Sequence, residues 1–97
     1  MAYSAAKYGI NGFTKSLALE WAPYGVRANC IAPGLTATER VLSQHSRDAF
    51  EAMGRTLPIG HAGEPDDVAE GIIFLLINDS DYMTGQTLHI NGGMVLP

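Results

Sequence analysis

The sequence predicts an α/β fold of about three helices and two parallel strands. Two short segments rich in apolar and β-branched residues, 26–32 and 86–90, are typical of strands. Apolar residues recur at helical spacing in the segments 2–21, 38–54 and 65–77. Because a long helical connection separates the two strands, we expect them to be parallel and to be joined by a right-handed crossover.

The first helix is expected over residues 2–21, where the composition is rich in alanine and the apolar residues favour one face. Gly9 and Gly12 lie inside this helix, and each costs ~1 kcal/mol relative to alanine. Two such glycines predict the close approach of another backbone. The proline and glycine within residues 22–25 then end the helix.

The first strand, residues 26–32, is expected to be buried and to end at the turn formed by Pro33 and Gly34. Its cysteine, Cys30, is the sole cysteine of the chain, which excludes an internal disulfide and suits a reducing compartment. We expect a buried structural thiol there. The charged segment 38–54 follows as a second helix that lies at the surface and is mobile.

The third helix is expected to begin at Pro65, because proline suits the first turn of a helix. Asp66 and Asp67 complement the positive end of its dipole, which explains them better than a catalytic carboxylate pair does. The second strand, residues 86–90, then ends at a turn over residues 91–93.

The bulk composition excludes several classes of function. The 97 residues suffice for one small domain, and 46% hydrophobic against 16% charged residues describes a globular chain. A net charge of −4, with six scattered basic residues, argues against nucleic acid and anionic membrane surfaces as partners. The longest apolar run, 71–77, is far shorter than the ~20 residues that span a bilayer. We expect a cytoplasmic protein without a signal peptide. No metal site is expected at His45, His61 or His89, because none of them has further metal-ligating residues at a suitable spacing.

Tyr3 and Lys7 lie four residues apart, and therefore on the same face of the first helix. An ammonium at that spacing favours the phenolate and lowers a pKa that is normally near ~10. Such a phenol can exchange a proton with an alcohol or carbonyl oxygen near neutral pH. The pair alone also fits an ordinary solvated helix face, so its meaning depends on the rest of the chain.

Further short motifs follow this pair in a definite order. They are Gly25-Val-Arg-Ala-Asn29, Pro33-Gly34, Gly63-Glu-Pro-Asp-Asp-Val-Ala69, Thr84-Gly-Gln86 and Asn91-Gly-Gly93. Each is weak alone. Together, over essentially all 97 residues, they resemble the C-terminal part of the short-chain dehydrogenase/reductase superfamily. The resemblance is closest to the subgroup of acyl-carrier-protein reductases and sugar or alcohol dehydrogenases.

The resemblance implies that residues 1–97 are the C-terminal segment of a Rossmann-like doubly wound domain. The N-terminal dinucleotide-binding half is then missing, since no G-x-G-x-x-G turn occurs in the sequence. The family uses NAD or NADP, whereas we expect the isolated chain to bind neither and to be inactive. Strand edges and helix faces left uncovered would favour a homo-oligomer.

The resemblance also implies a role for each matching residue. Tyr3 would be the general acid/base that protonates the carbonyl or deprotonates the alcohol. Lys7 would hold the ribose hydroxyls of the nicotinamide nucleoside and depress the pKa of Tyr3. No residue is expected to bind a metal.

Four further positions would face the nicotinamide. Pro33 and Gly34 would form the turn beside it, and the backbone of Thr36 and the hydroxyl of Thr38 would contact its carboxamide. Family members usually carry isoleucine or valine where Thr36 stands. Residues 35–57 correspond to the substrate lid of the family, so substrate identity is not readable from them.

Two functions of different classes follow. The first is an NAD(P)-dependent oxidoreductase that interconverts a small-molecule alcohol and carbonyl, represented here by its C-terminal catalytic segment. The second is a non-catalytic α/β fragment or an oligomeric assembly module. Binding of reduced cofactor separates the two.

Overall fold

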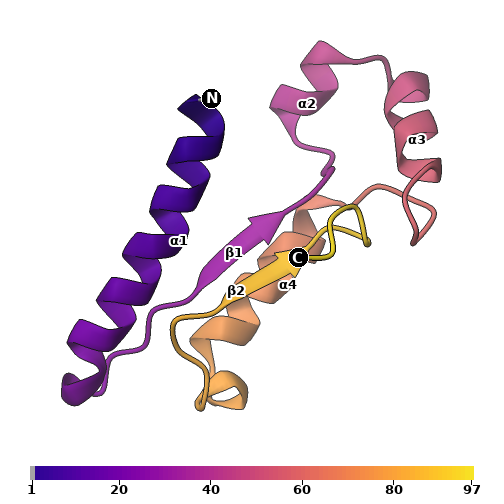
Figure 1. Ribbon diagram of the computed structural model, residues 1–97. Coiled ribbons are helices and arrows are strands. Elements are labelled where there is room, and N and C mark those ends of the chain that lie inside the picture. The colour runs from indigo at the N-terminus through magenta and orange to yellow at the C-terminus, as the bar shows by residue number, and fades with distance from the viewer. Residues whose placement is uncertain (1) are drawn as a thin grey trace.

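The computed structural model describes residues 2–97, with side chains described from residue 5 onward. Its helices and strands are α1 (Ala2–Trp21), β1 (Cys30–Pro33), α2 (Glu39–Gln44), α3 (Arg47–Arg55), α4 (Pro65–Leu76) and β2 (Thr87–Ile90), with short 3-10 helices at Ala22–Tyr24 and Asn78–Ser80 (Figure 1). The predicted α/β fold class is confirmed.

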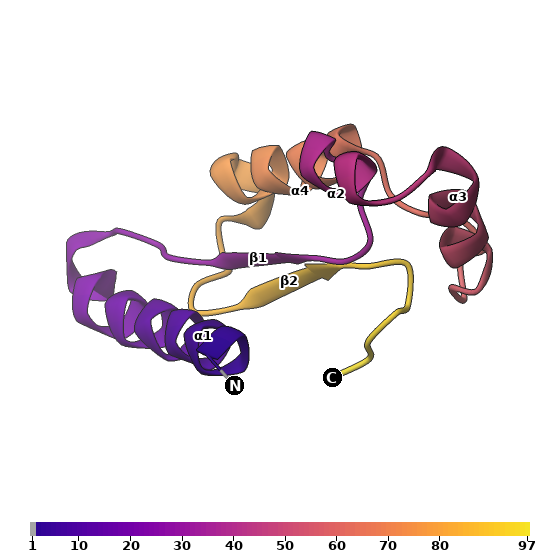
Figure 2. The same cartoon turned by 90° about the horizontal axis from the view of Figure 1, so that it is seen from above.

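The two strands form a parallel pair, as predicted, in which Cys30 lies opposite Thr87 and Pro33 lies opposite Ile90. Figure 2 shows α4 on one face of this pair and α1 on the other. A parallel sheet normally has both faces covered, and the helices provide that cover here. The carboxyl ends of β1 and β2 therefore point toward the same edge, where α2 and the C-terminal residues also lie (Figure 1).

The prediction of one continuous helix over residues 38–54 is wrong, because the segment forms two helices, α2 and α3. The chain is extended at His45 and Ser46, with ψ of 146° and 155°. The Ser46 side chain accepts a hydrogen bond from the Ala49 amide at 3.1 Å and so begins α3 as its N-cap. The described chain thus has four α-helices where about three were predicted.

The first strand is also shorter than predicted, because pairing begins at Cys30 and not at residue 26. The preceding residues bond to a loop and not to a strand. Asn29 donates to the Met83 carbonyl at 3.0 Å and accepts from the Gln86 amide at 3.1 Å. The expectation that Cys30 is fully buried is wrong as well, since it is only half-buried.

Arg27, in the segment before β1, bonds to the end of α4 and to the loop that follows it. Its guanidinium donates to the carbonyl oxygens of Leu75, Ser80 and Met83 at 3.1, 2.8 and 3.1 Å. The last carbonyls of a helix have no partner within the helix, so a side chain that reaches them holds the helix end in place. α4 also packs closely on β2, and a Cβ on Gly71 would contact the Cδ1 atom of Ile90.

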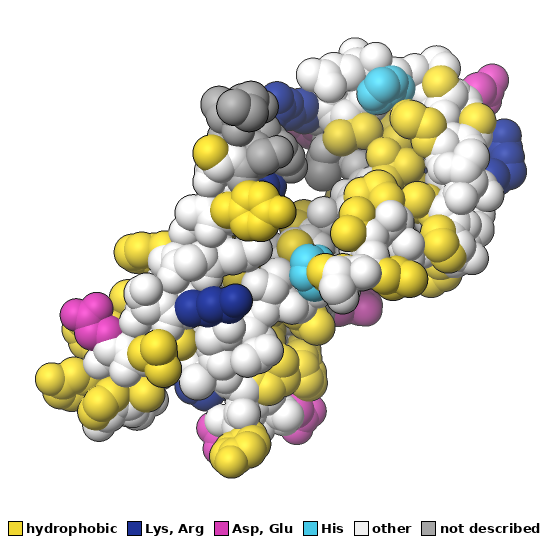
Figure 3. Space-filling view, viewed as in Figure 1, with side chains coloured by type: hydrophobic (Ala, Val, Ile, Leu, Met, Phe, Trp, Pro, Cys, Tyr) yellow, Lys and Arg dark blue, Asp and Glu magenta, His cyan; other side chains and the backbone are white. Residues whose placement is uncertain are grey.

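Little apolar surface is enclosed by the chain itself. Among the described side chains, the buried apolar residues are Ala18, Ala37 and Phe50. On α1, Phe13 is 66% exposed and Leu19 is 80% exposed, and Figure 3 shows apolar side chains spread over the visible face. Phe13 and Leu19 thus leave apolar surface on α1 that the described chain does not cover.

The two glycines of α1 behave differently from the expectation. A Cβ added at Gly9 or Gly12 meets nothing within 4 Å, so no backbone of the described chain approaches them. No helix among the described residues combines the length and apolar character that crossing a membrane requires.

Candidate functional site

Two adjoining clefts open at the carboxyl end of β1. The lysine cleft, of about 380 Å³, lies between α1 and the strand ends, and its walls include Lys7, Tyr8, Asn11 and His89. The threonine cleft, of about 500 Å³, lies between β1, α2 and α4, and its walls include Gly34, Thr36, Thr38 and Val41. Pro33 and Met94 line both clefts. Ligands of open α/β sheets bind at this edge of the strands.

Helix α1 brings Lys7 to the first of these clefts. The helix includes position 3, one turn before Lys7, but the Tyr3 side chain lies outside the described residues. On the same helix, Asn11 follows Lys7 by one turn, and its Oδ1 accepts a hydrogen bond from the Thr87 hydroxyl at 3.2 Å. This bond ties the lysine-bearing face of α1 to the start of β2.

The Pro33-Gly34 turn is fixed against the end of β2. The Gly34 amide donates to the Ile90 carbonyl at 2.9 Å. A Cβ on Gly34 would lie 2.6 Å from the Cβ of Asn91, which is too close for any side chain. Glycine is therefore needed at position 34 for packing, and this contact sets the direction in which the chain enters the threonine cleft.

The two threonines of the site use their hydroxyl groups differently. Thr36 is buried, and its hydroxyl donates to the Gly34 carbonyl at 3.1 Å. The exposed Thr38 is the N-cap of α2, and its hydroxyl oxygen accepts from the Val41 amide at 3.3 Å. A threonine hydroxyl has one proton to donate, and the capping bond does not use it. Thr38 thus keeps a donor for a ligand.

A parallel bridge between Thr36 and Gly63 holds the segment after the turn. The Gly63 amide donates to the Leu35 carbonyl and the Ala37 amide donates to the Gly63 carbonyl, both at 2.9 Å. The backbone at Thr36 is therefore fixed on one side by the loop before α4 and on the other by the turn after β1.

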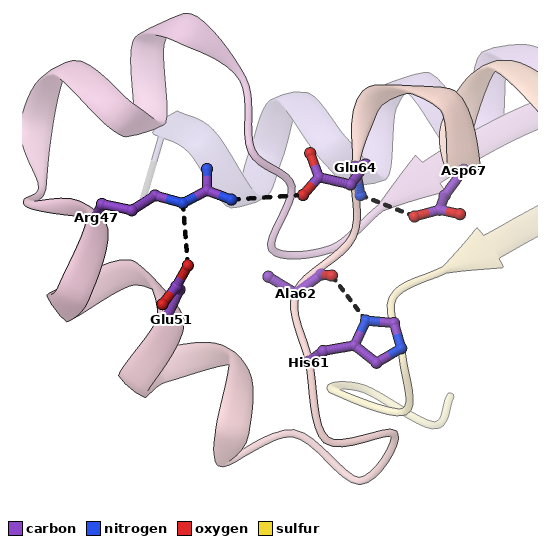
Figure 4. Close-up of polar contacts among 6 residues, drawn as sticks. All are labelled: Arg47, Glu51, His61, Ala62, Glu64 and Asp67. Atoms are coloured by element: carbon purple, nitrogen blue, oxygen red, sulfur yellow. Dashed lines mark hydrogen bonds and ion pairs between the residues drawn. The ribbon is translucent and has the colours of Figure 1, made fainter.

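Arg47 connects α3 to the beginning of α4 (Figure 4). Its Nε lies 3.2 Å from Glu51 Oε1 and its Nη2 lies 3.8 Å from Glu64 Oε1. The Glu64 amide in turn donates to Asp67 Oδ2 at 2.8 Å, and His61 Nδ1 lies 2.9 Å from the Ala62 carbonyl oxygen. Asp67 thus acts at a helix N-terminus, and no group of metal-binding side chains occurs among the described residues.

The positions predicted from the motifs thus fall into one region, with Tyr3 outside the described side chains. The structure adds Asn11, Asn91 and Met94, which sequence reasoning missed as site residues. The motif Asn91-Gly-Gly93 indicated only a turn.

A fold with parallel strands, a lysine-bearing helix on one face and clefts at the carboxyl ends is typical of an α/β protein of the Rossmann type. The particular family follows from comparison. The chain belongs to the short-chain dehydrogenase/reductase superfamily, and the sequence model of the family described as enoyl-(acyl carrier protein) reductase matches residues 1–95.

Individual relatives agree with this assignment. The chain is 42% identical over 95 residues to the 3-oxoacyl-(acyl-carrier-protein) reductase FabG of Buchnera aphidicola, covering 98% of this chain and 38% of that protein. A short chain oxidoreductase from Pseudomonas aeruginosa PAO1, solved with NADPH and containing an atypical catalytic center, superimposes with a TM-score of 0.86 at 32% identity. A 4-hydroxyisoleucine dehydrogenase complexed with NADH superimposes with a TM-score of 0.86 at 31% identity.

The matched region is only part of each relative. The superposition with the Pseudomonas enzyme includes 97% of this chain and 38% of that enzyme. The superposition with the 4-hydroxyisoleucine dehydrogenase includes 95% of this chain and 38% of that protein. The chain therefore spans less than two-fifths of the length of these proteins.

Proposed function

We propose that this chain supplies the proton-transferring and nicotinamide-facing side of an NAD(P)-dependent oxidoreductase that interconverts an alcohol and a carbonyl group. The observation that carries the proposal is the convergence of Lys7 with the 33–38 segment at two adjoining clefts. Its relatives include reductases and dehydrogenases, two of them solved with NADPH or NADH.

The donor groups around the clefts fit a nicotinamide nucleoside. An ammonium at Lys7 suits the ribose hydroxyls, and the spare hydroxyl proton of Thr38 suits the carboxamide oxygen. Pro33 offers an apolar surface beside the ring. The Thr36 hydroxyl is engaged with Gly34, so Thr36 would act through its backbone, as an isoleucine or valine would.

The chain's own chemistry would be proton transfer. The bound nicotinamide supplies or accepts the hydride. Tyr3 gives its phenolic proton to the carbonyl oxygen in reduction and takes the alcohol proton in oxidation. Lys7, one turn away, favours the phenolate by its charge and orients the ribose. Residues 35–57 form the lid, and Val41 of this segment lines the threonine cleft.

We propose further that the isolated 97-residue chain binds no dinucleotide and is inactive. The sequence has no G-x-G-x-x-G turn for a pyrophosphate. The free thiol of Cys30 supports a reducing compartment, and the cytoplasm is our proposal.

The test measures turnover of reduced cofactor by two samples. One is the polypeptide as the cell makes it, meaning the natural protein that contains these residues, and the other is the isolated 97-residue chain. Tyr3→Phe should lower kcat at least about 100-fold, and Lys7→Met should lower kcat and raise the KM for the cofactor. Tyr24→Phe and Lys15→Met, exposed positions on neither cleft, are the matched controls. Equal effects of the Tyr3 and Tyr24 substitutions would contradict the proposal.

The second candidate is a non-catalytic assembly module, which the exposed apolar residues of α1 favour. It predicts that the polypeptide as the cell makes it binds neither NADH nor NADPH. A titration with NADH or NADPH, followed by the fluorescence of Trp21 or of the cofactor, distinguishes the assembly module from the oxidoreductase.

A further inference from the structure

The dipeptide Asn-Gly occurs twice in the chain, at Asn11-Gly12 in α1 and at Asn91-Gly92 in the turn after β2. Asparagine is among the thermolabile residues of proteins. The amide nitrogen of the next residue can attack its side-chain carbonyl carbon, and glycine has no side chain that hinders this attack. Because the local backbone decides whether the reaction proceeds in a folded protein, the two copies can be compared within one molecule.

The helix protects the first copy. Gly12 lies inside α1, where its amide donates to the carbonyl oxygen four residues earlier. The nitrogen that would attack Asn11 is therefore engaged. The Asn11 side chain is held as well, since its Oδ1 accepts from the Thr87 hydroxyl at 3.2 Å. Reaction at Asn11 thus requires α1 to open locally.

The turn leaves the nitrogen of the second copy without a partner. Gly92 has a φ of 60°, and its carbonyl accepts from the Ile59 amide at 3.0 Å. Its own amide donates to no group of the described chain, because the bonds between the two strands end where the Gly34 amide donates to the Ile90 carbonyl. The Gly92 nitrogen is therefore available for attack without any opening of the fold.

Two hydrogen bonds at Asn91 favour that attack. The Gly93 amide donates to Asn91 Oδ1 at 2.9 Å, which draws electron density from Cγ and would stabilise the oxyanion that forms there. The Met94 amide donates to the Asn91 backbone carbonyl at 3.0 Å. This carbonyl and the Gly92 amide belong to one peptide unit, so the bond polarises the unit and makes its N–H group more acidic.

One contact opposes the reaction. Asn91 Nδ2 donates to the Val95 carbonyl at 2.9 Å, and this bond must break before the nitrogen can leave. The bond is exposed, and Val95 is 54% exposed, so water can replace it. It therefore delays the loss of ammonia less than the opening of a helix would.

We propose that Asn91 is a modification site that cyclises onto Gly92 in the folded protein, whereas Asn11 is protected. The Gly92 nitrogen forms a bond to Asn91 Cγ, the bond from Cγ to Nδ2 breaks, and the amide proton leaves with Nδ2 as ammonia. Water then opens the cyclic imide at either of its carbonyl carbons, which gives aspartate or isoaspartate at position 91. No further reactant is needed.

Both products change the surroundings of the clefts. Asn91 and Lys7 line the same cleft, so aspartate at position 91 adds a carboxylate to the wall that contains the ammonium. Aspartate also lacks the donor to Val95. Isoaspartate lengthens the backbone by one methylene at the tight contact with Gly34. The modification would therefore loosen the packing of the two turns against each other.

The experiment follows both dipeptides in the polypeptide as the cell makes it. The protein is incubated at mildly alkaline pH, either folded or in concentrated urea, and its peptides are analysed by mass spectrometry. Replacement of the side-chain NH2 by OH adds about 1 Da. In the folded protein we expect Asn91 to be converted at least about ten-fold faster than Asn11, because only Asn11 needs local opening. In urea we expect similar rates for the two.

A variant tests the structural consequence. Asn91→Asp, which reproduces one product, should lower the urea concentration at the midpoint of unfolding, because the bond to Val95 is lost. Asn78→Asp is the matched control, since it adds the same charge at an exposed asparagine that lines neither cleft.

Each outcome decides one claim. Conversion of Asn91 no faster than that of Asn11 in the folded protein overturns the proposal, whether both are slow or both are fast. An Asn91→Asp variant that unfolds at the same midpoint as the Asn78→Asp variant overturns the claim that modification loosens the turns. Neither measurement requires turnover, so the proposal stands or falls independently of the proposed function.

Discussion

Gly34 and Asn91 are in direct contact, since a Cβ on Gly34 would lie 2.6 Å from the Cβ of Asn91 and 2.7 Å from its Cα. The turn after β1 and the turn after β2 therefore share one packing site. Because Asn91 also closes the turn that positions Met94, a shift at Gly34 would reach both clefts.

We expect Gly34→Ala to lower the free energy of unfolding by about 1–3 kcal/mol, since a methyl group there must displace backbone atoms. The same shift should raise the KM for the cofactor in the polypeptide as the cell makes it. Urea unfolding and steady-state kinetics measure the two effects. An alanine variant with unchanged stability and KM would show that the turn adapts without cost.

Gly12→Ala is the matched substitution, because a Cβ at Gly12 meets nothing within 4 Å. In the isolated chain we expect it to stabilise α1 by up to ~1 kcal/mol, the helix propensity difference. If a further segment or a second copy packs against α1, the same change should instead weaken that assembly. Comparing urea unfolding with association measurements distinguishes the two situations.

The sequence predicted the elements well where periodicity and stop signals agreed. The helix 2–21 and the strand 86–90 matched within a residue of their observed bounds. The break between α2 and α3 was missed because Val41, Leu42, Phe50 and Met53 were assigned to the apolar side of one continuous helix. The available signal was Ser46, a favoured N-cap residue followed by an acidic residue in the first turn.

Only some of the residues that line the two clefts could be predicted. Lys7 and Pro33 were placed at one site by the family resemblance, because helical spacing and the strand pattern do not fix the distance between the two residues. Met94 could not be placed, because its position depends on two consecutive glycines with positive φ and on the hydrogen bonds of Asn91. Such a turn is set by tertiary contacts with the loop at Pro58 and Ile59.

Asp66 and Asp67 provide a test of how α4 begins. Both carboxylates lie in its first turn, but Asp67 also accepts the Glu64 amide at 2.8 Å. Asp67→Ala should lower the free energy of unfolding by about 1 kcal/mol, as the loss of a capping interaction does. Asp66→Ala should cost less, because it loses only the interaction with the helix dipole. Equal losses in urea unfolding would contradict a specific role for Asp67.

Arg27 should be the most sensitive basic residue of the described chain, because one guanidinium serves three carbonyl oxygens from Leu75 to Met83. We expect Arg27→Met to lower the free energy of unfolding by about 3 kcal/mol. Arg27→Lys should recover only part of this loss, since an ammonium lacks the planar fork. Arg55→Met, at an exposed position, is the control and should change stability little.

The isolated chain should self-associate at micromolar concentration. The amides of Cys30 and Gly34 both donate toward β2, so in a parallel strand the groups of Ile31 and Pro33 face the other edge of β1. No strand of the described chain pairs with that edge. Proline lacks an N–H group, so this edge offers few hydrogen bonds to a second copy. The apolar surface of α1 should therefore dominate association.

Phe13 is the residue that tests this surface, because its side chain is large and exposed on α1. Phe13→Glu should weaken self-association by about 2 kcal/mol, or roughly 30-fold in Kd, because a phenyl ring loses its burial. Ser16→Glu adds the same charge at another exposed position of α1 and controls for repulsion. Sedimentation velocity measures the mass. A wild-type chain that sediments as a 10.4 kDa monomer and unfolds cooperatively would show that these faces need no partner, and would argue against an assembly role for α1.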